Sequence, residues 1–468
     1  MRGTSGSELP RGPTNLVGTF LRYLVDPHGA FAAIARRYGD PFFLPIGDSG
    51  TVVTGDPAGI KAIMGSDPDT FESFRTEATN AILGEHSLFF QSGGRHREAR
   101  RMLSGPFHGQ RMRSWGRRIE ASVRQRLMAV PVGASFSLQQ LAQWIALDVI
   151  IPAVFGVTDR EQVAAFHQVV YSGFDRVGPA VLNFKILRHE FGGLGPWARV
   201  QRMVRALNRL TAEQIAARRA RPPAGEAADV IGELLAARYE DGSPIEDDEI
   251  RDKLFDMLIA GYETCAIEVA WAGYEICRAS RIHEQLLAEL ASTGADPDFE
   301  RLLALPFLNE VCQETLRLHP VFSLLTRKLA RPLLMKGYQL PAGIGVSAAI
   351  GSVHLREDLY PEPRTFDPSR FRGRTYTPFE YLPFGGGTQR CLGAAFATYQ
   401  MKIILATLFR SVRLRLRDDR PVRAVARAAT VAPRGGVEVT ILQRLRPPVW
   451  DVQTKKSGRS SASETFAY

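Results

Sequence analysis

The sequence predicts a mainly α-helical fold with a small β region. Helical patterns of apolar residues recur between short Pro- or Gly-containing turns over most of the 468 residues. Strand patterns are confined to residues 42–54, 327–346 and 412–442. An apolar content of 45% is enough to bury a substantial core.

The chain is predicted to form one domain over residues 14–450. No Ser/Gly-rich linker and no repeat of fixed period interrupts this stretch. Residues 1–13 and the tail 451–468, which is rich in Ser and Lys, carry no fold signal, and we expect both to be disordered.

Cap and turn signals place the elements in order. Asp26-Pro27 opens a helix that ends near Tyr38, and Asp56-Pro57 opens another. Between them, residues 42–45 and 51–54 flank a Gly-Asp-Ser-Gly turn and predict a hairpin. Further helices are predicted at about 95–104, 109–128, 138–155, 161–174, 195–219, 227–239, 247–279, 281–292, 306–318 and 393–410.

The long central helix carries the segment Ala260-Gly261-Tyr262-Glu263-Thr264. An acid beside a hydroxyl, just after a helix-weakening Gly, is costly inside an apolar helix. The pair is either functional, or a solvent-facing acid followed by a Thr that is bonded back to its own helix. The residues alone leave both interpretations open.

One cysteine lies in a glycine-rich loop just before the helix at 393–410. The loop, residues 384–393, reads Phe-Gly-Gly-Gly-Thr-Gln-Arg-Cys-Leu-Gly and contains Cys391. A helix N-terminus and backbone N–H groups both lower the pKa of a Cys, and the glycines allow a flat ligand to approach the backbone. We therefore expect an anionic sulfur; the alternative is a turn that ends in a buried Cys.

A third motif predicts a buried charge cluster. Glu314 and Arg317 share one face of the helix at 306–318, and Arg370 lies between two aromatic residues further along the chain. An exposed pair three residues apart is worth only about 0.2 to 0.5 kcal/mol. A second arginine for the same carboxylate would instead make a Glu-Arg-Arg cluster.

Together, and in this order, these segments resemble the cytochrome P-450 family. Shorter matches support the resemblance: Leu9-Pro10-Arg11-Gly12-Pro13, Gly94-Arg95-His96 with Arg100, and His319-Pro320 with Arg327. The resemblance covers nearly the whole chain. It implies a single-domain cytochrome P-450 fold, with haem between the long central helix and the helix that follows the Cys loop.

The resemblance also implies a role for each site residue. Cys391 would ligate the iron of haem b (iron protoporphyrin IX) as thiolate, which favours O–O cleavage. Glu263 and Thr264 would relay protons for the reaction with the co-substrate O2.

Further haem contacts are implied on three segments. The haem propionates would bind His96, Arg100 and Arg327. Phe384 and Gln389, in the Cys loop, would contact the cofactor. Gln389 departs from the family pattern, which usually has Arg or His there, and an amide donates a hydrogen bond but brings no charge.

Cysteine usage and hydropathy predict a cytoplasmic protein without a membrane anchor. Four cysteines at irregular spacing fit a reducing compartment. The apolar stretch at residues 16–25 is broken by Gly18, Thr19 and Arg22 and is no secretory segment. The only candidate span, residues 254–271, carries three acids. Membrane-anchored relatives start with an apolar helix, so the resemblance points to the soluble bacterial type.

The net charge of +10 does not predict a nucleic-acid partner, because the basic residues are mixed with acids and no nucleic-acid motif accompanies them. Some of them could form a basic patch for an acidic ferredoxin or flavodoxin, with a dispersed surface as the alternative: Arg97, Arg101, Arg111, Arg113 and Arg390. Too little chain follows Cys391 for a reductase domain. Electrons would therefore come from a separate donor with its own reductase.

Apolar segments predict a lipophilic substrate. The resemblance places residues 81–90, 174–191, 254–260 and 321–325 over the haem, and apolar walls select apolar ligands. The string at 83–88 resembles a bacterial branch associated with fatty acids and terpenoids. We expect a haem-thiolate monooxygenase that hydroxylates such a molecule. The alternatives are a peroxide-driven or dehydrating enzyme, disfavoured by Glu263-Thr264, and a non-catalytic haem-binding sensor.

Overall fold

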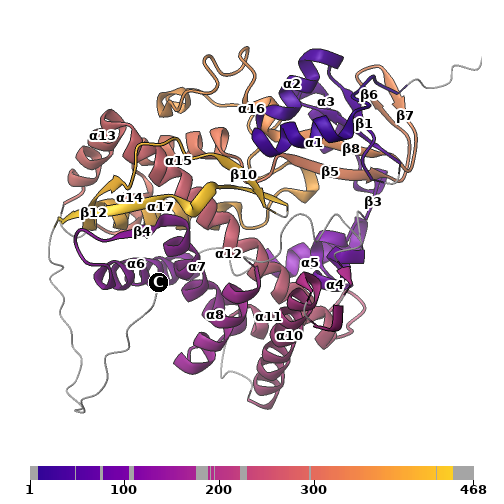
Figure 1. The fold of residues 1–468 in the computed structure, drawn as a ribbon. Coiled ribbons are helices and arrows are strands. Elements are labelled where there is room, and N and C mark those ends of the chain that lie inside the picture. The colour runs from indigo at the N-terminus through magenta and orange to yellow at the C-terminus, as the bar shows by residue number, and fades with distance from the viewer. Residues whose placement is uncertain are drawn as a thin grey trace, which may run out of the picture.

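A computed structural model describes residues 9–47, 49–73, 77–104, 110–174, 188–189, 191–193, 195–221, 229–294, 297–427 and 429–445. Helices dominate these residues, and the strands form small sheets on both sides of the view (Figure 1). The predicted mainly α fold with a small β region is confirmed.

The helices follow the predicted pattern closely. In chain order they are α1 (Leu16–Val25), α2 (Gly29–Tyr38), α3 (Pro57–Met64), α4 (Glu77–Leu83), α5 (Gly93–Ser104), α6 (Gln110–Ala129), α7 (Leu138–Phe155), α8 (Arg160–Phe174), α10 (Pro196–Ala220), α11 (Val230–Ala236), α12 (Asp247–Arg278), α13 (Ser280–Ala291), α14 (Phe299–Leu303), α15 (Pro306–Leu318), α16 (Ile350–His354) and α17 (Ala394–Ser411). The sequence did not predict α1, α4, α14 and α16.

One five-stranded sheet contains the predicted hairpin. Its strand order is β1-β2-β8-β5-β3, with β1 (Phe42–Leu44), β2 (Thr51–Thr54), β3 (Phe71–Glu72), β5 (Leu324–Leu329) and β8 (Gly345–Ala349). The hairpin pairs Phe42 with Val53, and β2 runs parallel to β8.

Three smaller sheets complete the β region of the described chain. The three-stranded one has the order β4-β12-β9, with β4 (Ser135–Ser137), β9 (Val412–Leu416) and β12 (Glu438–Arg444). The other two are hairpins of β6 (Leu333–Met335) with β7 (Tyr338–Leu340) and of β10 (Ala424–Arg427) with β11 (Thr430–Pro433).

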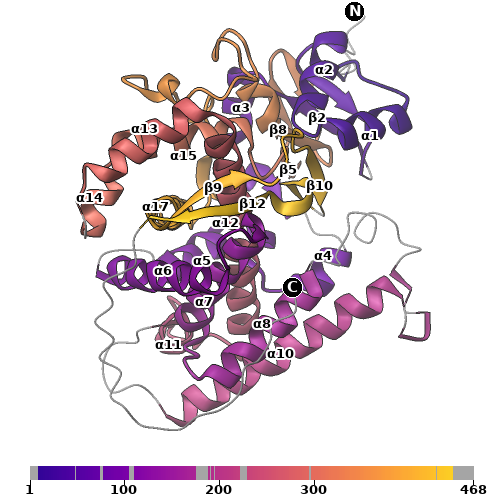
Figure 2. The ribbon, with the colours of Figure 1, turned by 60° about the vertical axis from the view of Figure 1, so that its left-hand side comes forward.

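Helix α12 passes through the middle of the molecule in both views (Figures 1 and 2). Three acids in its first turn, at residues 247–249, favour the helix start through the helix dipole. Most of its side chains are buried, and it packs on α7, α15 and α17. The sheets with α1–α3 lie on one side of it, and α8 and α10 run side by side at the far edge (Figure 2).

Two sequence predictions about the ends and the spans need correction. The chain is ordered before Thr14, because the Arg11 carbonyl accepts a hydrogen bond of 3.0 Å from the Phe43 N–H and Pro10 is buried. The run 254–271 is not the only span candidate. Within the described chain α7 alone is long and apolar enough to cross a membrane, and 72% of it is buried inside the fold. Residues 1–8 and 446–468 lie outside the description, so the boundary near 450 stays a prediction.

The predicted Glu-Arg-Arg cluster is formed, with Glu314 and Arg317 fully buried and Arg370 partly buried. The Arg317 guanidinium donates to both carboxylate oxygens of Glu314, at 2.6 and 2.7 Å, and Arg370 donates to one of them at 3.2 Å. The N–H of Asp367 donates to the same oxygen at 2.9 Å. Each charge in the cluster therefore has an opposite charge or a hydrogen-bond partner.

His354 connects this cluster to the Cys loop. Its Nδ1 lies 3.0 Å from the carbonyl oxygen of Arg317, and its Nε2 accepts the N–H of Leu382 at 3.1 Å. Burial, with the charge of Arg317, lowers the pKa of His354 to about 3, so the ring is neutral and can accept at Nε2 while donating at Nδ1. Leu382 lies two residues before the Cys loop.

Two acids near the start of α12 fix the segment that follows α4. Asp252 accepts the N–H of His86 at 2.9 Å. Asp256 accepts the Ser87 hydroxyl at 2.7 Å and the Leu88 N–H at 2.6 Å. Burial raises the pKa of Asp256 to about 7, although both hydrogen bonds act in the opposite direction.

Replacing Glu314 by Ala should strongly destabilise the protein. The change leaves Arg317 and Arg370 without their carboxylate in the interior, and removing one partner of a buried pair costs about 3 to 5 kcal/mol. Glu300→Ala is the matched control, because its pair with Arg113 is exposed and worth at most about 1 kcal/mol. Denaturant unfolding compares them, and equal losses for the two variants would contradict this view of the cluster.

Asp256→Asn should change how stability depends on pH. The folded pKa of about 7 lies above the unfolded value of about 4, so the folded state holds the proton more tightly. This contribution is complete below about pH 4 and is lost as the pH rises through about 7. Wild-type stability should therefore fall relative to the variant over that window, measured by unfolding at a series of pH values. Parallel pH profiles would show that Asp256 does not titrate there.

Candidate active site

Cys391 is held in a tight loop between η7 (Gly387–Gln389) and α17. Its N–H donates to the Phe384 carbonyl at 2.9 Å, which closes the loop. Gly387 has a φ of 65°, and a Cβ there would meet the Met64 carbonyl oxygen at 2.1 Å. Only glycine fits this approach of two backbone segments.

The predicted lowering of the Cys391 pKa is wrong for the protein without metal. Burial is the largest influence and raises the pKa of the thiol. The Gly393 N–H and the charges of Arg100 and Arg390 act in the opposite direction but do not outweigh it. The loop supplies the expected N–H group, and the desolvation of the sulfur was not visible in the sequence.

The Cys391 side chain is nevertheless open on one side. It lines a hollow of about 480 Å³ together with Met112 of α6, Leu303 of α14 and Lys402 of α17. Phe384 and Arg390 line the same hollow. A sulfur that is exposed to a cavity and surrounded by protein elsewhere is available as a metal ligand.

The three predicted propionate partners come from two distant segments and lie near one another. His96 and Arg100 are one turn apart on α5, and Arg327 belongs to β5. Burial lowers the pKa of His96 to about 4, and the charges of Arg100 and Arg327 lower it further. Arg100 also interacts electrostatically with Cys391. Burial lowers the pKa of Arg100, and the charge of Cys391 raises it by a smaller amount.

The surroundings of Arg327 indicate whether the site is suited to a haem. It is 7% exposed, and burial lowers its pKa to about 10. Its guanidinium contacts the Gly386 carbonyl at 3.3 Å and the Phe71 ring, and in the described part of the chain it forms no ion pair with a carboxylate. A buried cation beside two further basic groups and the Cys loop fits a cofactor that brings its own carboxylates.

The centre of α12 is open where such a cofactor needs room. Ala260 is exposed although the helix around it is mostly buried. A few residues later, the Cys265 sulfur contacts the Ala397 carbonyl of α17 at 3.9 Å. The two helices thus meet at these residues, and upstream of them both Ala260 and Cys391 remain uncovered.

Both side chains of the Glu263-Thr264 pair, the predicted proton relay, already have a partner within the protein. The Thr264 hydroxyl donates to the Ala260 carbonyl at 2.6 Å, as the second sequence interpretation expects. Glu263 is not simply solvent-facing, because it lies 3.6 Å from the Arg427 guanidinium of β10. The hydroxyl oxygen still has lone pairs that can accept a hydrogen bond.

Gln389 and the basic patch are exposed in part. Gln389 lies on the surface of η7, as do Arg97 and Arg390 on their segments. Arg101 pairs with Glu98 and Glu240, and Arg113 pairs with Glu300, so two of the five arginines are neutralised by carboxylates. The side chain of Arg111 lies outside the description.

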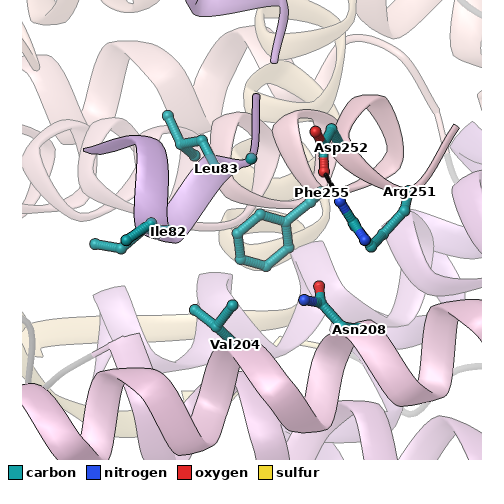
Figure 3. A pocket seen from close by; sticks show the side chains of 9 residues that line it. Ile82, Leu83, Val204, Asn208, Arg251, Asp252 and Phe255 are labelled. Atoms are coloured by element: carbon teal, nitrogen blue, oxygen red, sulfur yellow. Dashed lines mark hydrogen bonds and ion pairs between the residues drawn. The ribbon is translucent and has the colours of Figure 1, made fainter. Parts of the chain in front are cut away.

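A second cavity of about 190 Å³ lies between α4, α10 and α12 (Figure 3). Its walls include Ile82, Leu83, Val204 and Phe255, with Asn208 and the Arg251–Asp252 pair at one side. Of the predicted apolar segments, residues 81–84 line it, and residues 175–187 lie outside the description.

Sequence reasoning missed the polar part of this cavity. Asp252 was seen only as part of a helical pattern, and its partners at residues 84–88 are far away in the chain. The acids within an otherwise apolar helix could have indicated these contacts, because each buried carboxylate needs a hydrogen-bond donor from another segment.

Comparison with known proteins agrees with this geometry. The Cytochrome P450 family profile matches residues 9–439. The putative cytochrome P450 135B1 of Mycobacterium tuberculosis is 33% identical over 450 residues, covering 94% of this chain and 93% of that protein. The putative cytochrome P450 137 of the same species is 31% identical, covering 95% and 91%.

Solved structures agree in fold. The retinoic acid-bound cyanobacterial CYP120A1 superposes with a TM-score of 0.80 at 23% identity, covering 94% of this chain and all of that one. The haem domain of cytochrome P450DA gives 0.80 at 22% identity, covering 94% of this chain and 98% of that one. The predicted fold and the monooxygenase class with its haem iron are confirmed, and the chain belongs to the cytochrome P450 family.

Proposed function

We propose that this monooxygenase inserts one oxygen atom from O2 into a lipophilic, fatty-acid-like or terpenoid molecule, using electrons from a separate ferredoxin or flavodoxin and its reductase. The observation that carries the proposal is Cys391, open to a cavity on one side, with two arginines and a neutral histidine gathered beside its loop. A haem bound through a Cys thiolate supplies the chemistry that activates oxygen.

Cys391 would hold the haem iron through its sulfur. The Gly393 N–H and the charges of Arg100 and Arg390 favour the thiolate, and coordination to a metal supplies the remaining stabilisation that burial removes. Phe384 lines the same hollow and would pack against the cofactor.

His96, Arg100 and Arg327 would bind the two propionates. Arg327 is the strongest candidate, because a buried guanidinium without a carboxylate gains most from an anion. Gln389 is exposed on the Cys loop and could donate a hydrogen bond without charge. Propionate binding therefore depends mainly on the two arginines, with His96 as a neutral hydrogen-bond donor.

Glu263 and Thr264 would handle the proton. The Thr264 oxygen can accept a hydrogen bond from a water while its O–H donates to the Ala260 carbonyl. Glu263, held toward Arg427, can exchange protons with solvent through its remaining exposure. Proton delivery requires Thr264 to exchange its bond to Ala260 for one to a water, a local rotation about χ1.

The cavity between α4, α10 and α12 supports the proposed class of substrate. Four apolar side chains in its wall would contact the apolar part of a substrate, beside a larger share of polar lining. Its polar side, where Asn208 lies beside the Arg251–Asp252 pair, suits one polar group on the substrate (Figure 3). Both a fatty acid and an oxygenated terpenoid combine an apolar body with one polar group.

The surface around the Cys loop would face the electron donor. Arg390 is exposed on this loop and Arg97 is exposed on α5, so an acidic partner is favoured there. The pairing of Arg101 and Arg113 with carboxylates makes this patch smaller than predicted. A cytoplasmic location, expected from the cysteine content, would supply such partners.

A spectral screen tests the proposed function. Lipids and terpenoids are added to the haem-loaded protein, and those that shift the spin state are incubated with O2 and a ferredoxin with its reductase. Hydroxylated product supports the proposal. Product with hydrogen peroxide alone and none with the donor would favour a peroxide-driven enzyme, and spectral binding without any product would favour a sensor.

Cys391→Ser should abolish the thiolate-type, red-shifted Soret band of the reduced carbon monoxide complex. A hydroxyl cannot donate electron density as a thiolate does. Cys277→Ser, a change at a half-buried cysteine of α12, should leave the band in place. A red-shifted band that survives in Cys391→Ser would remove Cys391 as the ligand.

Thr264→Ala should divert electrons from product to free hydrogen peroxide while leaving haem and substrate binding intact. General acid assistance is worth roughly 100- to 10,000-fold in rate. Thr264→Ser keeps the hydroxyl and should retain most of the coupling. Product formed per reductant consumed is measured for all three proteins, and an unchanged ratio in Thr264→Ala would assign proton delivery to another group.

A further inference from the structure

Helix α1 turns its apolar side chains away from the protein. It carries six of the thirteen large apolar residues that are exposed in the described chain: Leu16, Val17, Phe20, Leu21, Leu24 and Val25. None of its residues is buried. An exposed apolar cluster of this kind marks an interaction site, whereas scattered exposed residues need no explanation.

The six residues form one continuous stripe. They stand at i, i+1, i+4, i+5, i+8 and i+9, and at 100° per residue these positions cover one half of the helix surface. Exposure is highest along one row of this half, at 71% for Val17, 57% for Leu21 and 79% for Val25, and it is 40 to 48% for Leu16, Phe20 and Leu24. The stripe is therefore tilted, with the row of Val17, Leu21 and Val25 most open to solvent.

The opposite side of α1 is attached to the fold. Tyr23 packs against Phe31 of α2, with ring centroids 5.7 Å apart, and Thr19 lies one turn before it on the same side. The Asn15 side chain caps the helix by accepting the Gly18 N–H at 2.9 Å. The helix is thus formed and oriented before anything covers its stripe, and Figure 2 shows it at the outer edge of the molecule.

Exposed arginines surround this part of the fold. Arg22 lies on α1 beside the stripe, Arg11 precedes the helix, and Arg36 and Arg37 occupy the last turn of the adjoining α2. No ion pair joins any of them to a carboxylate of the described chain. A basic rim next to an apolar stripe matches an anionic lipid surface, which offers both headgroup charge and acyl chains.

Size favours a lipid surface over a second copy of the chain. A ten-residue helix is about 15 Å long, so its stripe offers only a few hundred Å² of apolar surface. A stable protein interface needs about 800 Å² on each partner. An interfacial helix needs no such area, because its apolar face enters the acyl boundary while electrostatic attraction adds to binding.

From this geometry we infer that α1 docks the protein peripherally on an anionic membrane surface. The stripe would lie in the interface plane with Val17 and Leu21 deepest, and the arginines would contact headgroups. Docking of this kind is reversible and separate from the buried helix α7. It does not depend on the proposed reaction.

Vesicle flotation tests the inference with the haem-loaded protein. Vesicles of phosphatidylcholine mixed with phosphatidylglycerol are compared with vesicles of phosphatidylcholine alone. The double variant Val17→Asp/Leu21→Asp should reduce the bound fraction about tenfold or more, since both charges would enter the apolar boundary. Met128→Asp is the matched control, because Met128 is equally exposed on α6, far from α1 in Figures 1 and 2.

The charged rim is tested separately. Arg36→Glu/Arg37→Glu should remove most of the preference for anionic vesicles, and salt should do the same in the wild type. Melting temperatures are measured for every variant, and all substituted side chains are exposed, so the fold should be retained.

The outcomes separate clearly. Flotation of the wild type and of Met128→Asp, with loss in Val17→Asp/Leu21→Asp, supports the inference. A wild type that binds no vesicle, or a double variant that binds equally well, overturns it. A dimer in gel filtration that the double variant splits, without vesicle binding, would make the stripe an interface between copies.

Discussion

The ion pair of the buried Glu314 carboxylate with Arg317 is the interaction on which the position of the Cys391 loop depends. The carboxylate compensates Arg317, whose remaining donors hold the carbonyls of His354 and Pro363 at 2.8 Å. His354 in turn accepts the Leu382 N–H at the entrance to the Cys loop. A charge that is satisfied in this way can stay in the interior, and every group that satisfies it is fixed in place. The cluster therefore orders a backbone segment that contains neither a helix nor a strand of useful length.

Much of the fold could be read from local signals. Helix α7 begins and ends at the predicted residues because Ser137 caps its first turn and Gly156, at a φ of 68°, ends it. The Glu314 cluster was predicted for a similar reason, because the three-residue spacing places Glu314 and Arg317 on one helix face. The Cys loop was predicted from its glycines, and Gly387 has the close backbone contact that they imply.

What the sequence could not supply is the surroundings of each group. The pKa of Cys391 depends on how many atoms surround the sulfur, which no motif encodes, and burial prevails over the loop's N–H. Glu263 is paired with Arg427, a residue of a distant hairpin, and no spacing rule connects the two. Helix α1 was missed because its apolar residues were judged as a failed secretory segment, whereas Asn15 caps a real helix that is amphipathic toward solvent.

The acids of α12 explain how one helix can organise the whole site. Together they fix three different segments: Asp252 and Asp256 hold residues 86–88, Glu263 meets β10, and Glu275 accepts from His319 at 2.9 Å. Glu268 differs, because its oxygens have no hydrogen-bond partner among the described residues and burial raises its pKa well above the usual range. Between these attachments only the stretch around Ala260 is left uncovered. The charges that make α12 a poor membrane span thus fix its neighbours on both sides, and they leave open the stretch around Ala260 that we propose for the cofactor and substrate.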